Sequence, residues 1–129
     1  MVDAQLSLLQ GAQAYVTEIF NRRVDARFHF HNLQHTQQVV RAAEELAAHY
    51  RLNDEDRTVL LLAAWFHDTG FSGGRAEDHE KESVRIATEY LQSVQASPDL
   101  VQRVSSCIQA TRMPQSPITL VEKIMCDAD

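Results

Sequence analysis

The feature that most constrains the fold is an uninterrupted apolar segment near the middle of the chain. Every residue from Val59 to Phe66 is hydrophobic, and a His-Asp pair, His67-Asp68, follows directly. A helix with apolar side chains on all sides must be covered on all sides by other elements. The segment is too short to cross a bilayer, which needs about 20 apolar residues. We therefore expect a helix at the centre of a bundle.

The rest of the chain shows helical periodicity almost throughout. Apolar residues recur at intervals of three and four, the spacing that places them on one face of a helix. No segment shows the alternation expected of a strand. We therefore predict an all-α bundle of about six helices. The expected helices cover residues 4–24, 35–50, 54–66, 77–94, 98–111 and 117 onward.

Local signals place the expected boundaries of these helices. Asn53 is a plausible N-cap for the central helix, and Ser97-Pro98 and Ser116-Pro117 are typical helix starts. The segment 28–32 and the glycines after His67-Asp68 are expected to be loops. In the helix over 77–94, we expect the inward face to carry four residues: Val84, Ala87, Leu91 and Val94.

Length and charge narrow the class of protein. A chain of 129 residues favours a single domain over residues 1–129. The net charge of −6 argues against duplex DNA as the main partner, but it does not exclude a small phosphate compound. Two cysteines without a CxxC motif, and no signal peptide or membrane span, favour a cytoplasmic setting. Because the amphipathic pattern still runs at Asp129, we expect the natural protein to continue with further helices.

The most informative polar residues are His67 and Asp68, at the end of the expected central helix. Polar groups beside a buried apolar segment need partners, and a metal ion is one suitable partner for an imidazole and a carboxylate. The alternative is a helix-end histidine bonded to a backbone carbonyl, with Asp68 bonded to loop amides. The pair alone does not distinguish a metal ligand from a hydrogen-bonded helix end.

Two further groups could complete a site. His31 and His35 lie four residues apart, at the expected start of a helix, and Asp127 and Asp129 follow the apolar Ile124-Met125-Cys126 segment. Alternatively, these are surface histidines and solvated acids at a frayed helix end.

Three strings, taken in order, resemble the HD-domain metal-dependent phosphohydrolases, in particular the small stand-alone bacterial type. HNLQHT is similar to the HNxxH of the family's cyclic-nucleotide phosphodiesterases, AAWFHDTG is typical of small members, and IMCDAD looks like the final motif. The resemblance implies that a divalent metal is held by His35, His67, Asp68 and Asp129. Asp129 is favoured over Asp127 because it follows an alanine, and residues at i and i+2 point to different sides of a helix.

The resemblance also suggests roles for other polar residues. His79 would bind a second metal or a phosphate, or would be an exposed residue at a helix start. The histidines usual in two-metal branches are absent around Ala110-Thr111-Arg112, which puts a fully protein-ligated two-metal centre in doubt. His31 would protonate the leaving group, and Asp68 would orient the attacking water. Three residues are candidate phosphate clamps or ordinary surface cations: Arg75, Lys81 and Arg112. His29 and His49 are expected at the surface.

The expected function is hydrolysis of a phosphomonoester or phosphodiester, with a nucleotide as substrate. A mixed nitrogen and oxygen donor set suits Mn²⁺, Fe²⁺, Co²⁺, Ni²⁺ or Zn²⁺ better than Mg²⁺. The alternatives are a non-catalytic sensor that binds a nucleotide or metal, and an HD-type di-iron oxygenase, which would need more histidine ligands. A homodimer is compatible with the sequence.

Overall fold

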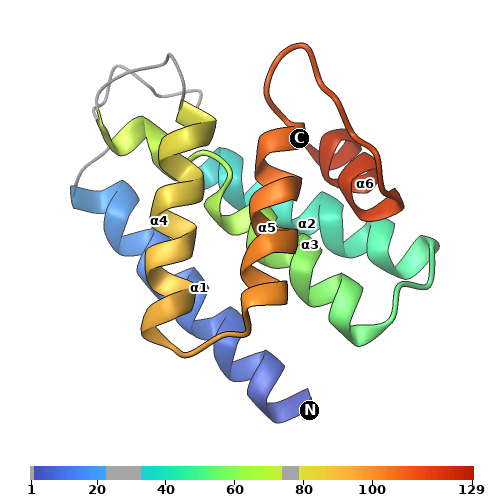
Figure 1. Ribbon diagram of the computed structural model, residues 1–129, viewed down its shortest axis with the longest axis horizontal. Coiled ribbons are helices and arrows are strands. Elements are labelled where there is room, and N and C mark those ends of the chain that lie inside the picture. The colour runs from blue at the N-terminus through green and yellow to red at the C-terminus, as the bar shows by residue number, and fades with distance from the viewer. Residues whose placement is uncertain (1, 23–32, 74–78) are drawn as a thin grey trace.

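The computed structural model describes residues 2–22, 33–73 and 79–129, and within these it contains helices and no strand. The elements (Figure 1) are α1 (Val2–Arg22), α2 (Leu33–His49), α3 (Asp54–Phe66), η2 (Thr69–Gly73), α4 (His79–Ser93), α5 (Pro98–Ala110) and α6 (Leu120–Ala128). The predicted all-α bundle is confirmed. Among the described residues, no helix has the length and apolar character that crossing a bilayer requires.

Helix α3 forms the centre of the bundle. It contacts α1, α2, α4, α5 and α6, and every residue from Thr58 to Phe66 is buried. Asn53 caps the helix as predicted, because its side-chain oxygen accepts a hydrogen bond of 2.8 Å from the backbone N–H of Asp56. The burial of α3 on all sides confirms the prediction made from its composition.

The surrounding helices each turn one apolar face toward α3. Helix α2, for example, buries Val39, Val40, Ala43 and Ala47. One predicted core position is wrong: Val94 is 46 % exposed, because α4 ends at Ser93 and the chain turns away there. Segment 69–73, which we expected to be a loop, is the short 3₁₀ helix η2.

The predicted start of the sixth helix is also wrong. Helix α6 begins at Leu120 rather than at Pro117. Thr119 is the N-cap, and its hydroxyl accepts a hydrogen bond from the N–H of Glu122. The Glu122 carboxylate in turn accepts a bond of 3.0 Å from the N–H of Ile118. This reciprocal arrangement provides acceptors for two N–H groups near the start of the helix. The helix therefore begins after Thr119 rather than at Pro117.

A buried serine joins the end of α3 to α4. The hydroxyl of Ser83 donates to the carbonyl of His67 (2.8 Å) and accepts from the N–H of Gly70 (2.7 Å). Gly70 is required at this contact, because a Cβ atom there would lie 1.8 Å from the backbone oxygen of His79. Ser83 and Gly70 together fix the backbone around His67 and Asp68 against the start of α4.

Replacing Ser83 by alanine should destabilise the fold. The variant leaves the N–H of Gly70 and the carbonyl of His67 without their buried partner, and we expect a loss of about 2 kcal/mol in unfolding free energy. Ser93→Ala is the matched control, since Ser93 is an exposed residue whose hydroxyl donates to the carbonyl of Tyr90 within its own helix. Urea unfolding of both variants measures the difference. Equal stabilities would contradict this role for Ser83.

Candidate metal centre

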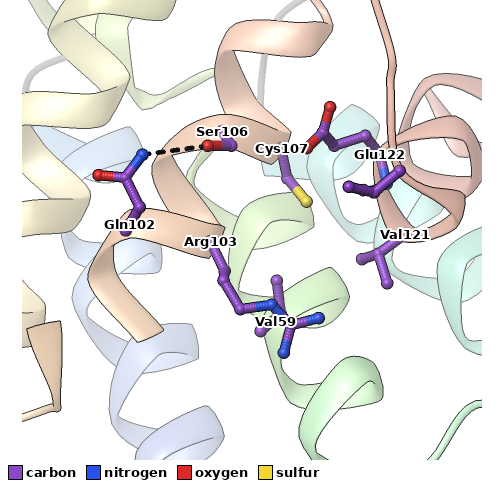
Figure 2. Close-up of a pocket in the computed structure, with 8 residues that line it drawn as sticks. Val59, Gln102, Arg103, Ser106, Cys107, Val121 and Glu122 are labelled. Atoms are coloured by element: carbon purple, nitrogen blue, oxygen red, sulfur yellow. Dashed lines mark hydrogen bonds between the residues drawn. The ribbon is translucent and has the colours of Figure 1, made fainter. Parts of the chain in front are cut away.

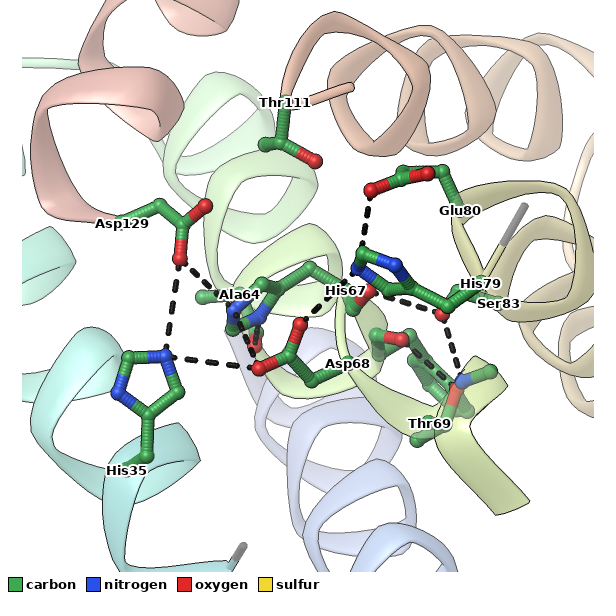
Figure 3. Close-up of polar contacts among 12 residues, drawn as sticks. His35, Ala64, His67, Asp68, Thr69, His79, Glu80, Ser83, Thr111 and Asp129 are labelled. Atoms are coloured by element: carbon green, nitrogen blue, oxygen red, sulfur yellow. Dashed lines mark hydrogen bonds and ion pairs between the residues drawn. The ribbon is translucent and has the colours of Figure 1, made fainter. Parts of the chain in front are cut away.

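Four predicted side chains meet at one end of α3, although they come from three distant parts of the sequence (Figure 3). His35 lies in the first turn of α2, His67 and Asp68 follow α3 directly, and Asp129 follows α6. Helices α2 and α6 both pack on α3, which brings their polar ends to the His-Asp pair.

The potential ligand atoms of these residues converge. Nε2 of His67 lies 3.1 Å from Oδ1 of Asp129, and Nε2 of His35 lies 3.7 Å from the same oxygen. Oδ2 of Asp68 lies 3.5 Å from Nε2 of each histidine. The ligand atoms of His35, His67 and Asp129 all lie within 4.8 Å of one another, and Asp68 borders this group through both histidines. Imidazole nitrogens beside carboxylate oxygens are the donors of a mixed metal site.

The orientation of His67 favours a cation at this point. Its Nδ1 lies 2.7 Å from the carbonyl oxygen of Ala64, and a carbonyl can only accept, so Nδ1 carries the hydrogen. In the neutral ring, Nε2 then presents a lone pair to the cluster. Nε2 is buried and makes no hydrogen bond, although carboxylate oxygens lie nearby. The carbonyl-bonded histidine considered from the sequence is thus present, and it is compatible with metal binding through the other nitrogen.

The charges in the cluster are strongly coupled. Burial lowers the pKa of His67, but the carboxylates of Asp68 and Asp129 outweigh burial and raise that pKa to about 9. Burial raises the pKa of Asp129, but contact with His67 outweighs it, and the net shift is downward. Without a metal, a proton on His67 compensates these carboxylates at neutral pH. A divalent cation would replace that proton.

The centre is deep on one side and open on the other. The side chains of His67 and Asp68 are 1 % and 4 % exposed, whereas those of His35 and Asp129 are 29 % and 25 % exposed. Water and a small ligand can therefore approach past α2 and the end of α6, while the His-Asp pair stays held in the core.

The structure adds His79 to this cluster and leaves several other predicted residues outside it. Nε2 of His79 lies 3.4 Å from Oδ1 of Asp68. Asp127, Lys81, Arg112 and His49 are exposed, which matches the surface position expected for His49. The predictions for His29, His31 and Arg75 lie outside the described residues.

Sequence reasoning missed Ser83, which fixes the backbone of the His-Asp pair from α4. Its position was detectable, because Ser83 lies four residues after His79 and so shares its helix face. A serine on the apolar face of an amphipathic helix indicates a buried hydrogen bond.

A separate cavity of about 200 Å³ lies between α3, α5 and α6 (Figure 2). Its arginine, Arg103, is already paired with the carboxylates of Asp56 and Glu55. Burial raises the pKa of Cys107, which also lines the cavity, to about 12, so this thiol stays protonated at neutral pH. The polar groups of this cavity are therefore less suited to bind a ligand or to react than those of the His-Asp cluster.

Comparison with known proteins agrees with this geometry. A model of the HD domain matches residues 32–129, and the chain therefore belongs to the HD-domain family. The match covers the four ligand candidates and the helices that carry them. Comparisons with curated proteins and with solved structures gave no significant match.

Metal binding should stabilise the folded protein, since the site exists only when α2, α3 and α6 are assembled. We expect Mn²⁺ to raise the melting temperature of the wild type and EDTA to reverse the effect. Asp129→Asn should remove most of the rise, whereas Asp127→Asn should keep it. Differential scanning fluorimetry measures both. If only Asp127→Asn lost the Mn²⁺-induced rise, Asp127 rather than Asp129 would be the ligand.

Metal affinity should increase with pH. His67 carries a proton below its raised pKa of about 9 and loses it above that value, so a cation must displace the proton at neutral pH. We expect the affinity for Mn²⁺ to rise up to about tenfold per pH unit from about pH 7 to about pH 8.5. Calorimetry in buffers of different ionisation enthalpy should show release of about one proton. Binding without proton release would contradict this coupling.

Proposed function

We propose that this protein is a metal-dependent phosphohydrolase that cleaves a small phosphate ester, with a nucleotide as the substrate class. The observation that carries the proposal is the buried Nε2 of His67, which faces two carboxylates and makes no hydrogen bond. A nitrogen lone pair beside two carboxylates is stable only if the nitrogen carries a proton or if a cation lies between these groups. Membership in the HD-domain family favours the cation.

The donor set supports particular metals. His35, His67, Asp68 and Asp129 would hold the ion, and two imidazoles with two carboxylates suit Mn²⁺, Fe²⁺, Co²⁺, Ni²⁺ or Zn²⁺ better than Mg²⁺. When bound, the ion supplies an acidified water and a Lewis acid for a phosphoryl oxygen. The partial exposure of His35 and Asp129 leaves the approach that water and substrate need.

The chain's own groups divide the remaining work. Asp68 is held by its burial and by the histidines around it, so its carboxylate is fixed to orient the attacking water and to accept its proton. We assign proton donation to the leaving oxygen to His31. We assign contacts with the substrate phosphate to Arg75, Lys81 and Arg112, since guanidinium and ammonium groups bind phosphate oxygens.

A screen of phosphate esters tests the proposal. The wild type should hydrolyse one or more nucleotides or cyclic nucleotides with Mn²⁺, Co²⁺, Ni²⁺ or Mg²⁺. His35→Ala should lower kcat/KM by about 100-fold or more, the loss expected when a metal site is disrupted. His49→Ala, an exposed histidine on the same helix, should retain full activity.

His67→Ala and Asp68→Ala should abolish both metal binding and hydrolysis. Metal analysis and circular dichroism of these variants show whether the helices remain when the metal is lost. Full activity without bound metal would disprove the mechanism. Nucleotide binding without turnover would instead indicate a sensor, and oxygen consumption by an iron-loaded protein would indicate an oxygenase.

A further inference from the structure

An apolar groove of about 540 Å³ lies between α1, the end of α4 and the start of α5. Helix α4 begins at His79, beside the metal centre, and ends at Ser93, beside the groove, so the groove and the centre lie at opposite ends of α4 (Figure 1). One wall of the groove belongs to α1 and the other to the segment from α4 to α5. The groove is lined on these two sides by Ala4, Ser7 and Gly11, and by Tyr90, Val94 and Leu100.

The two walls are fixed relative to each other by contacts of Tyr90. Its hydroxyl donates to the carbonyl of Leu8 (2.9 Å), and its ring packs on that of Tyr15 with centroids 5.2 Å apart. Gly11 permits this close approach of α1 to α4, because a Cβ atom there would collide with the Tyr90 hydroxyl. The groove is therefore formed before any partner binds, which lowers the cost of binding.

Both walls come from charge-free stretches of the sequence. Residues 4–17 and residues 90–98 contain no Asp, Glu, Lys or Arg, although charged residues make up 23 % of the chain. A surface helix usually carries charged residues on its outer side, whereas Ala4, Ser7 and Gln10 are exposed on α1. Depletion of charged residues distinguishes the core of a protein interface from the rest of a surface.

Charge also favours a second copy of this chain as the occupant. The net charge of −6 makes two copies repel each other, and the repulsion is smallest where the facing surfaces carry no charge. In a two-fold dimer each surface faces its own image, so the surface must supply both a hollow and a side chain that fills it. Val94 is such a side chain, because it lines the groove and is still 46 % exposed.

We propose that this groove is the interface of a symmetric homodimer, in which Val94 of each protomer enters the groove of the other. The proposal is independent of the phosphohydrolase function. Because the groove and the metal centre lie at opposite ends of α4, the dimer leaves the partly exposed side of the centre, at His35 and Asp129, open. Metal binding should therefore be the same in the monomer and in the dimer.

Analytical ultracentrifugation of the whole chain tests the proposal. The wild type should have twice the mass of one chain at micromolar concentrations. Val94→Glu and Ala4→Glu each place one carboxylate per protomer in the apolar contact, and each should raise the dimer dissociation constant by about tenfold or more. Leu6→Glu is the matched control, since Leu6 is 53 % exposed and lies two residues from Ala4, on a different side of α1. It should keep the wild-type dissociation constant.

The other results would overturn the dimer. A monomeric wild type would do so, and binding of an apolar dye that Val94→Glu abolishes would then assign the groove to a small apolar ligand. Dissociation by Leu6→Glu alone would place the interface on the other side of α1. Circular dichroism should show intact helices in all three variants, because the substituted residues are exposed, and Ala4→Glu supplies the test if Val94→Glu unfolds. The Mn²⁺-induced rise in melting temperature should persist in the monomeric variants, so a failure of the dimer and a failure of the metal centre are observed separately.

Discussion

The burial of α3 on all sides is the constraint on which the rest of the structure depends. Because five other helices must cover it, its C-terminal end is enclosed, and His67 and Asp68 are held with almost no exposure. Burial makes their polar atoms costly unless they are compensated. The same packing that forms the core therefore requires a proton or a cation to compensate these groups, and it brings the ends of α2 and α6 beside them.

The polar groups at this end of the bundle are arranged in layers around Asp68. Behind it, the backbone of the His-Asp pair is fixed by Ala64 and Ser83, which set the tautomer of His67 and the turn into η2. In front, His35 and Asp129 contact the cluster from its partly exposed side. On the third side, His79 and Glu80 come from α4. Rigid support of this kind keeps ligand atoms in place before the metal arrives.

Much of the site could be predicted from the sequence. The uniform hydrophobicity of residues 59–66 determined a central helix, and the His-Asp pair after it marked the chemistry. The boundary of α6 was missed because a Thr119–Glu122 cap competes with Ser116-Pro117, and such competition is decided by local hydrogen bonds. Periodicity predicts Val94 in the core, but periodicity does not show that α4 ends one residue earlier, at Ser93.

By itself, the sequence determined that this chain forms a helical bundle with an imidazole and carboxylate cluster, because hydrophobic periodicity and residue type are local properties. The tertiary structure decided which aspartate enters the cluster: Asp129, rather than Asp127, lies beside His67 in the group of mutually close ligand atoms. It also decided that the two oxygens of Asp68 face opposite groups and that Glu80 is buried beside His79. These relations depend on how α2, α4 and α6 pack on α3, and contacts between distant segments leave no periodic pattern in a single sequence.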